Sequence, residues 1–313
     1  MATPTQNHNE TLFSINGRIV PESDAVIPVT DRGFLYGDGL FETLHAYGRT
    51  LFRLSHHLDR LQKAAAQLCF DPLPDIGILA RWLGSAVDSA GFPEANVRIT
   101  VTRGSGPRGP SLFTPVDGIA KAVQFDPMVV ITVTRQGRPA KSRTTEGVGA
   151  IIASIRRQES AATTSLKTLN YIEQILARRE ADLAGADEAL LLNNAGLLCE
   201  GSASNIALIR SGVLTMPDPV RVGALPGIAQ LTAVDAARRL GIPVAWTMLS
   251  PWDPGTSEEA FLSGSMREIT PLVRVGETIV GTGKPGPITL KLIQEYRRIV
   301  ERECPPFTFE ERV

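Results

Sequence analysis

The sequence predicts an α+β fold, in which strands cluster and helices lie between the clusters. Alternating apolar and polar residues predict strands near residues 97–104 and 128–135. Amphipathic patterns predict helices near residues 226–240 and 286–303. Strands and helices do not alternate strictly along the chain, which argues against a doubly wound parallel sheet.

The length of 313 residues suggests two domains. We expect an N-terminal domain over residues 1–135 and a C-terminal domain over residues 145–313. Residues 136–144 would form the linker, because this stretch is polar and contains Gly and Pro, as interdomain segments commonly do.

Turn and cap signals place further elements in the N-terminal half. Asn16-Gly17 lies between two apolar runs and predicts a tight hairpin. Residues 40–46 and 51–53 predict a second strand pair, followed by a helix that we expect Ser55 to cap. Another helix is predicted over about residues 75–90.

In the C-terminal half a helix is expected just after Lys167. The spacing of its apolar residues predicts that Ile172, Ile175 and Leu176 form the buried face. Strands are predicted at residues 149–155, 243–248 and 260–263, with three more strands in residues 188–216.

Composition indicates an ordinary globular chain. It is 43% hydrophobic and 21% charged, and its formal net charge of −1 gives no reason to expect nucleic acid or an anionic membrane as partner. No apolar run reaches the roughly 20 residues of a membrane span, and the polar N-terminus lacks a signal-peptide core. Three widely separated cysteines favour reduced thiols and a cytoplasmic location.

Several familiar motifs are absent or incomplete. GSGPRG at residues 104–109 matches the dinucleotide pattern, but Pro110 follows and no helix is predicted, so we interpret it as a tight loop displaying Arg108. Phosphate-loop and zinc patterns do not occur, and the adjacent His56 and His57 would point in different directions on a helix. We therefore predict no metal site.

Lys167 is the strongest candidate for chemistry. It is the only lysine between Lys141 and Lys284. A partly desolvated lysine has a lowered pKa, so its free amine can form a Schiff base with a carbonyl cofactor. A lone lysine is more often a solvated surface residue, so this hypothesis depends on the motifs around it.

Other segments could bind an anion. Pro226 begins a predicted helix whose first N–H groups include those of Ile228 and Ala229, a common phosphate-binding arrangement. Ser263-Gly264-Ser265 ends a predicted strand with small polar residues. Arg60 could be a solvated helix arginine, and a buried Glu200 would need a cationic partner.

Six segments in the same order along the chain resemble the class IV (fold type IV) pyridoxal-phosphate enzymes, which include branched-chain and D-amino-acid aminotransferases and aminodeoxychorismate lyase. The resemblance covers about residues 12–300 and implies a D-amino-acid-aminotransferase-like fold with the cofactor in an interdomain cleft. The segments are DRGFLYGDGLFET, HLDRL, SLKTLNY, EGSASN, LPGI and FLSGSMREITP.

This resemblance implies pyridoxal 5′-phosphate as cofactor and gives roles to individual residues. Lys167 would form the Schiff base and then move the proton at the substrate α-carbon. Glu200 would pair with the protonated pyridine nitrogen, which makes the ring an electron sink. Tyr171 would donate a hydrogen bond to the ring hydroxyl, although branched-chain members place this tyrosine one residue later.

The resemblance also implies a set of phosphate and substrate ligands. The phosphate ligands would be Arg60, Ser265 and the backbone N–H groups of Ile228 and Ala229, where many relatives carry threonine at the last position. The substrate-binding candidates are Phe41, Arg98 and Arg108. D-amino-acid enzymes have tyrosine at the position of Phe41 and histidine at Pro110, and branched-chain enzymes have an aromatic residue at Asn96. The chain thus matches neither subfamily fully.

The implied reaction is ping-pong transamination between an amino acid, or an amine, and a 2-oxo acid such as 2-oxoglutarate. The resemblance also implies a homodimer. Aminodeoxychorismate lyase, which would eliminate pyruvate with the same lysine and cofactor, is the alternative. A cofactor-free binding protein is a third hypothesis, and the presence of both Lys167 and Glu200 argues against it.

Overall fold

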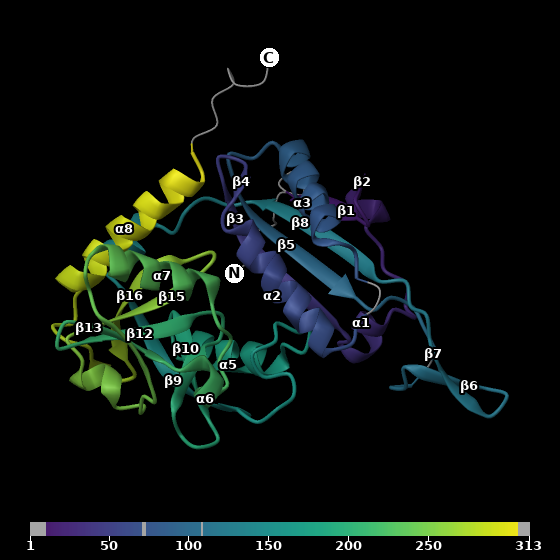
Figure 1. Cartoon of the computed structure of the whole chain (residues 1–313). Coiled ribbons are helices and arrows are strands. Elements are labelled where there is room, and N and C mark those ends of the chain that lie inside the picture. Colours follow the sequence, from purple (N-terminus) through teal and green to yellow (C-terminus); the bar gives the residue numbers. More distant parts are fainter. Residues whose placement is uncertain (1–10, 71–72, 108, 306–313) are drawn as a thin grey trace, which may run out of the picture. The chain divides into compact units, whose positions relative to one another are not determined.

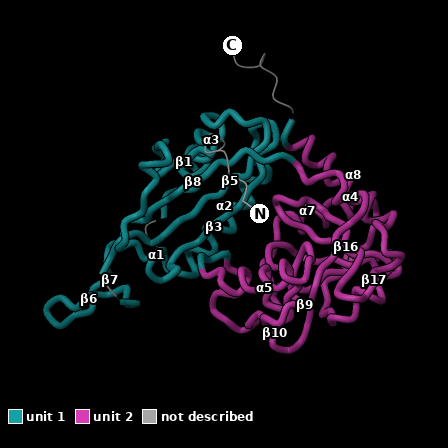
Figure 2. The backbone as a smooth tube through the Cα atoms, turned by 180° about the vertical axis from the view of Figure 1, so that it is seen from behind, with its two compact units in different colours: residues 1–137, 167–169, 304–313 teal, residues 138–166, 170–303 magenta. Residues whose placement is uncertain are grey.

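The computed structural model describes residues 11–70, 73–107 and 109–305 (Figure 1). The chain divides into two compact units, coloured separately in Figure 2. Unit 1 comprises residues 1–137, 167–169 and 304–313, and unit 2 comprises residues 138–166 and 170–303. Lys167 therefore belongs to the unit built mainly from the N-terminal half of the chain.

Unit 1 is built on an antiparallel sheet of six strands in the order β2-β1-β8-β5-β3-β4. Helices α2 (Leu54–Gln67) and α3 (Ile76–Ala90) pack on one face of this sheet (Figure 1). Alternate residues of the central strands are therefore buried beneath the helices, and the residues between them are half-buried on the other face. The strands are β1 (Thr11–Ile15), β2 (Arg18–Val20), β3 (Gly39–Tyr47), β4 (Thr50–Leu51), β5 (Glu94–Thr102) and β8 (Met128–Arg135).

The first hairpin of unit 1 confirms the turn prediction, whereas the helix cap differs from it. Asn16 and Gly17 have φ values of 47° and 79°, the left-handed conformation that a tight hairpin between twisted strands needs. The predicted cap at Ser55 is wrong, because α2 already begins at Leu54. Arg53 occupies the cap position with φ 52° and no side-chain cap bond, since the chain turns directly from β4 into the helix.

Three small elements of unit 1 were not expected. Helix α1 (Arg32–Tyr36) precedes β3, and η2 (Glu22–Asp24) precedes α1. Strands β6 (Phe113–Val116) and β7 (Ile119–Ala122) form a hairpin that extends away from the six-stranded sheet (Figure 1). Pro115 within β6 hid this hairpin, because proline is confined to positions where a strand needs no N–H donor.

Unit 2 contains a mixed sheet of nine strands. Its main path runs β11-β10-β9-β16-β15-β12-β13-β14, and β17 pairs with β16. The pairs β9–β10, β9–β16 and β13–β14 are parallel, and the others are antiparallel, which confirms the α+β class. The strands are β9 (Val148–Arg157), β10 (Glu188–Asn193), β11 (Leu198–Gly201), β12 (Asn205–Arg210), β13 (Val213–Pro217), β14 (Val244–Thr247), β15 (Glu259–Gly264), β16 (Glu268–Val275) and β17 (Thr278–Ile279).

Helices of unit 2 pack on this sheet through different kinds of side chain. Helices α7 (Ile228–Arg239) and α8 (Pro287–Glu303) pack on each other and on β15 and β16. Helix α5 (Ile172–Leu183) packs on β9 and β10. The short elements are α4 (Lys141–Thr145), inside the stretch predicted as a linker, α6 (Pro219–Val222) and η3 (Asp253–Thr256).

The predicted buried face of α5 is wrong. Ile172, Ile175 and Leu176 are 62%, 58% and 42% exposed, whereas Ala177 and Ala181 are fully buried. The alanines lie in a core cluster with alanines of the sheet, so the helix approaches β9 and β10 closely through small side chains. Its larger apolar side chains consequently point away from the sheet.

The strand prediction for residues 188–216 is also corrected, because this stretch forms four strands, β10 to β13, rather than three. No helix among the described residues has the length and apolar character needed to cross a membrane.

Candidate active site

Lys167 is held against strand β3 of unit 1. The N–H of Phe41 donates to the carbonyl of Lys167 at 2.9 Å, and the N–H of Leu169 donates to the carbonyl of Gly39 at 3.0 Å. Leu40 and Thr168 form the bridge between these bonds. The lysine therefore lies on an extended segment paired with a sheet, before helix α5 begins at Ile172.

One aromatic ring contacts two cations. The Lys167 Nζ atom lies 4.5 Å from the ring centroid of the buried Phe41, and the guanidinium carbon of Arg98 lies 3.7 Å from the same centroid. The Nε–H of Arg98 also donates to Thr100 Oγ1 at 3.1 Å. The negative ring face of Phe41 thus keeps an amine and a guanidinium close together. Arg98 is a partner of this site rather than a residue turned away from it.

Arg60 is bound to a buried carboxylate, Glu42. Its Nε and Nη2 donate to the two Glu42 oxygens at 2.7 Å each, and His57 Nδ1 lies 2.7 Å from Oε2. Burial alone would raise the pKa of Glu42, but the charge of Arg60 and the hydrogen bonds from both partners lower it to about 2. Burial lowers the pKa of His57 by more than Glu42 raises it. The bidentate contact fixes the plane of the Arg60 guanidinium.

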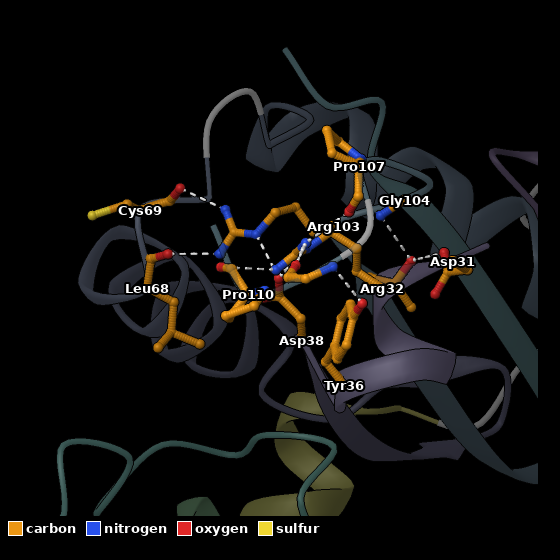
Figure 3. Close-up of polar contacts among 12 residues, drawn as sticks. Asp31, Arg32, Tyr36, Asp38, Leu68, Cys69, Arg103, Gly104, Pro107 and Pro110 are labelled. Atoms are coloured by element: carbon orange, nitrogen blue, oxygen red, sulfur yellow. Dashed lines mark hydrogen bonds and ion pairs between the residues drawn. The ribbon is translucent and has the colours of Figure 1, made fainter. Parts of the chain in front are cut away.

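The loop after β5 is organised by Arg32 (Figure 3). Its guanidinium donates to the carbonyl oxygens of Pro107, Gly109 and Pro110 at 3.5, 2.9 and 3.4 Å. Its Nε donates to Asp38 Oδ2 at 2.8 Å, the same oxygen that accepts from Arg103 Nε. The segment forms a loop, as predicted.

Asp38 ties this loop to the rest of unit 1. Burial opposes its ionisation, but hydrogen bonds and charge from both arginines outweigh burial and lower its pKa. Arg103 in turn donates to the carbonyls of Leu68 and Cys69, beyond the end of α2 (Figure 3). Arg108, the predicted substrate ligand in this loop, lies outside the described residues.

In unit 2, Glu200 on β11 is buried beside a cation and a backbone donor. Arg157 at the end of β9 places Nε 3.3 Å from Glu200 Oε1, and the N–H of Leu225 donates to Oε2 at 2.9 Å. Arg157 also donates to Glu173 at 3.4 Å. Arg157 is the cationic partner that a buried Glu200 was expected to need.

The start of α7 forms a second polar cluster in unit 2. Gly227 is its N-cap and makes no side-chain cap bond, and Ile228 and Ala229 begin the helix. Asn205, the first residue of β12, donates through Nδ2 to the carbonyl of Leu225 at 2.9 Å. Opposite Asn205 on β15, the buried hydroxyl of Ser263 has no hydrogen-bond partner among the described residues. The cluster offers donors suited to an anion.

Two other predicted residues lie near these clusters in the sequence and on the same unit. Ser265 follows β15 in the turn that leads to β16, and Tyr171 is the N-cap of α5, with φ −108° and ψ 15°. In the turn after Ser265, Arg267 Nη2 lies 2.9 Å from Glu188 Oε2. Glu188 is completely buried and also accepts hydrogen bonds from the hydroxyls of Ser202 and Ser204. This carboxylate joins the EGSASN loop to the turn after β15.

Comparison with known proteins identifies the family. The family model for amino-transferase class IV matches residues 39–275. This chain belongs to the class IV aminotransferases. A protein provisionally named a branched-chain-amino-acid aminotransferase, from Methanocaldococcus jannaschii, is 33% identical over 91% of this chain and 95% of its own length. The D-alanine aminotransferase of Listeria innocua is 31% identical over 93% of this chain and 96% of its own length.

Solved structures agree with this assignment. The 4-amino-4-deoxychorismate lyase of Pseudomonas aeruginosa has a TM-score of 0.79 and 30% identity, covering 95% of this chain and 100% of that protein. Branched-chain amino acid aminotransferases with TM-scores of 0.84 and 0.83 were solved with pyridoxamine 5′-phosphate and with a phosphopyridoxyl-glutamate adduct. The class IV aminotransferase is a pyridoxal-phosphate enzyme, and the fold and cofactor predictions are confirmed.

The described residues of this aminotransferase fit that cofactor. Unit 1 supplies the amine of Lys167 for the aldehyde, and unit 2 supplies the carboxylate of Glu200 for a protonated ring nitrogen. The unpartnered Ser263 hydroxyl and the start of α7 suit a phosphate. Among the residues that the structure describes, no cluster of three or more His, Cys, Asp or Glu side chains could hold a metal ion.

Sequence reasoning missed the partners that hold the expected site residues in place. Glu42 lies in a quoted motif, and its spacing in a β-strand gave no sign that it would face Arg60 on a helix. Arg157 follows another arginine at the end of β9, and only the fold shows which of the two meets Glu200. Arg32 is also part of a quoted motif, and the loop that it binds is distant in the sequence.

Proposed function

We propose that Lys167, Glu200 and Tyr171 are the residues that act on the cofactor ring in this aminotransferase. The bound cofactor supplies an aldehyde that exchanges amino groups and a ring that withdraws electrons. Lys167 takes and returns the proton at the substrate α-carbon. Glu200 keeps the ring nitrogen protonated, supported by the neighbouring charge of Arg157 at 3.3 Å. Tyr171 donates a hydrogen bond to the ring hydroxyl.

We assign the phosphate group to Arg60, Ser265 and the N–H groups of Ile228 and Ala229. The start of α7 supports this assignment, because its first N–H groups lack intrahelical partners and the helix dipole favours an anion there. The alanine at position 229 offers no side-chain hydroxyl, and its backbone donor is unaffected. The fixed guanidinium of Arg60 supports the same role.

We further propose that Arg98 binds the carboxylate of the amino acid or 2-oxo acid, with Phe41 forming part of the binding surface. The contact of both Arg98 and Lys167 with the Phe41 ring carries this proposal, because it places a carboxylate-binding cation close to the reacting amine. Arg108 is the competing candidate. The expected substrates are an amino-acid donor and a 2-oxo acid such as 2-oxoglutarate, in a ping-pong cycle.

Two substitutions separate the arginines. Arg98→Ala should raise the KM for an amino-acid donor at least about tenfold, the cost of losing one charge-assisted hydrogen bond, and leave the KM for a carboxylate-free amine nearly unchanged. Arg108→Ala should affect both donors equally. The opposite pattern assigns the carboxylate to Arg108, and equal effects from both variants overturn the assignment of either arginine.

Lys167→Ala tests the central role. The variant should lose the visible absorbance of the lysine-bound cofactor and all turnover, because no other amine would take its place. Lys141→Ala, a change at an exposed lysine of α4, is the matched control and should retain both. Visible absorbance and turnover in Lys167→Ala would disprove the assignment.

The handedness of the donor is measured on the purified protein by adding L- and D-amino acids separately. The relatives include a branched-chain-amino-acid aminotransferase and a D-alanine aminotransferase, so both series belong in the test. The panel that shifts the visible band towards the pyridoxamine form defines the donor class.

A lyase is the second candidate function, because the Pseudomonas aeruginosa lyase shares 30% identity with this chain. A band that no amino acid or amine shifts, together with release of pyruvate from aminodeoxychorismate, would establish it. We favour transamination, since the family model and the relatives above are aminotransferases.

We also propose a homodimer in the cytoplasm. Exposed apolar side chains support self-association, among them Phe34 at 67% and Ile172 at 62% exposed. Three free cysteines support a reducing compartment. Light scattering on the purified chain tests the first point, and a single-chain mass would contradict it. Cell fractionation tests the second, and a membrane or secreted fraction would contradict it.

A further inference from the structure

Leu225 is held from both sides by the two ends of one short loop. Its N–H donates to the carboxylate of Glu200 at 2.9 Å, and its carbonyl accepts from the side-chain amide of Asn205 at 2.9 Å. Glu200 lies near the end of β11 and Asn205 begins β12, so the two residues flank the loop between these strands. The same peptide segment leads directly into α7.

The side chain of Asn205 also fills the space beside Gly227. A Cβ atom on Gly227 would lie 1.9 Å from Asn205 Oδ1, far closer than any van der Waals contact. Because φ of Gly227 is −74°, the glycine is not needed for its backbone conformation. Close packing against Asn205 is therefore the reason for a glycine at this N-cap.

Asn205 consequently determines where the first turn of α7 begins. Its amide group fixes Leu225 by a hydrogen bond and contacts Gly227 by packing, so it touches both sides of Pro226. The side chain is almost completely buried, and Ser263, with its unpartnered hydroxyl, lies opposite on β15. A buried amide that loses its partner costs free energy, so the side chain and the turn hold each other in one arrangement.

We propose that Asn205 is a positioning residue for phosphate recognition: it holds the Leu225–Gly227 turn so that the N–H groups of Ile228 and Ala229 face the cofactor phosphate while Leu225 stays bound to Glu200. This inference rests on the proposed phosphate site. Asn205 acts through the turn and supplies no hydrogen bond to the phosphate itself. Its removal should therefore weaken the selection of phosphorylated over unphosphorylated cofactor.

The test compares the affinities of pyridoxal 5′-phosphate and pyridoxal for the full chain, stripped of cofactor, by titrating the visible band. Asn205→Ala should weaken pyridoxal 5′-phosphate by about 10- to 100-fold, corresponding to the loss of one buried hydrogen bond. The affinity for pyridoxal should change by less than about threefold, a small fraction of that loss. Inorganic phosphate should compete with pyridoxal 5′-phosphate less well in the variant than in the unaltered protein.

Asn193→Ala is the matched control. Asn193 is another buried asparagine of unit 2, and its side chain accepts from the N–H of Leu197 in the turn between β10 and β11. Its loss should lower thermal stability without changing the ratio of the two affinities. An equal loss of both affinities in Asn205→Ala would show a purely structural role and overturn the inference.

Gly227→Ala provides an independent probe in case Asn205→Ala folds poorly. The added methyl group should displace the asparagine and weaken pyridoxal 5′-phosphate binding in the otherwise unaltered protein. In the Asn205→Ala background, where the clashing oxygen is absent, the same change should have little further effect. Additive effects of the two changes would overturn the inference. If the unaltered protein does not distinguish the two cofactor forms, the proposed phosphate site itself fails.

Discussion

Each unit buries one carboxylate against an arginine, but the two carboxylates are stabilised in different ways. Glu42 in unit 1 accepts two hydrogen bonds from Arg60 and one from His57. Glu188 in unit 2 contacts Arg267 once and otherwise accepts from neutral donors, including the Ser202 and Ser204 hydroxyls. Glu42 depends mainly on a cation, and Glu188 depends mainly on neutral dipoles.

The difference matches the work that we propose for the two arginines. Arg60 is a proposed phosphate ligand, and its bidentate contact with Glu42 limits the directions in which its guanidinium can point. Arg267 has no proposed ligand role, and Glu188 uses it together with the serines to join two loops. A carboxylate that orients a cation should be sensitive to loss of charge, whereas one that organises loops should tolerate a neutral acceptor better.

Glu42→Gln should have the largest effect. Removing the charge leaves the Arg60 guanidinium paired with a neutral amide, and breaking a buried ion pair costs about 3–5 kcal/mol. Hydrogen exchange of the β3 and β5 amides measures this loss within unit 1, with the β10 and β12 amides of unit 2 as internal reference. A loss below about 1 kcal/mol in unit 1, the range of exposed ion pairs, would show that the charge of Glu42 is unimportant for stability.

Acidification should produce the next largest effect, again in unit 1. The folded pKa of Glu42, about 2, is below its ordinary value of 4.5, so its contribution is complete above 4.5 and is lost as pH falls towards 2. This contribution is about 3 kcal/mol, from 1.36 kcal/mol per pKa unit. The lowered pKa of His57 acts in the same direction from its ordinary value of 6.5 downward, because the unfolded chain binds the proton first.

The same hydrogen-exchange experiment, repeated at a series of pH values, measures the acid effect. In Glu42→Gln the loss between pH about 4.5 and 2 should be much smaller, while the change near 6.5 from His57 should remain. An unchanged acid profile in Glu42→Gln would assign the acid sensitivity to other groups.

Glu188→Gln should cost less, about 2 kcal/mol, because a glutamine oxygen still accepts one hydrogen bond and the serine hydroxyls can rotate to accept from its amide. Exchange of the β10 and β12 amides should increase, with β3 and β5 as reference. A loss in unit 2 equal to that of Glu42→Gln in unit 1 would remove the distinction between the two carboxylates.

These buried partners mark the limit of what the sequence predicts. Periodicity predicted the α+β class and most helices, because each such pattern depends on residues a few positions apart. It failed for α5, where Ala177 rather than Ile175 packs on the sheet, since the identity of a buried face depends on how closely the facing strands approach. Motifs placed Lys167 and Glu200 among the site candidates, but the partners Phe41 and Arg157 are set by strand pairing between distant segments.

The smallest effect should come from an ion pair that neither carboxylate resembles. Arg238 and Asp235 lie one turn apart on α7, with Nη1 3.8 Å from Oδ1, and the Arg238 side chain is 71% exposed. Water screens such a pair, so Arg238→Ala should change the stability of unit 2 by less than about 0.5 kcal/mol. Thermal unfolding in low and high salt measures it. A change that approaches that of Glu188→Gln would mean that exposed charges contribute as much as the buried ones, and the contrast between the two buried carboxylates could then not be attributed to their burial.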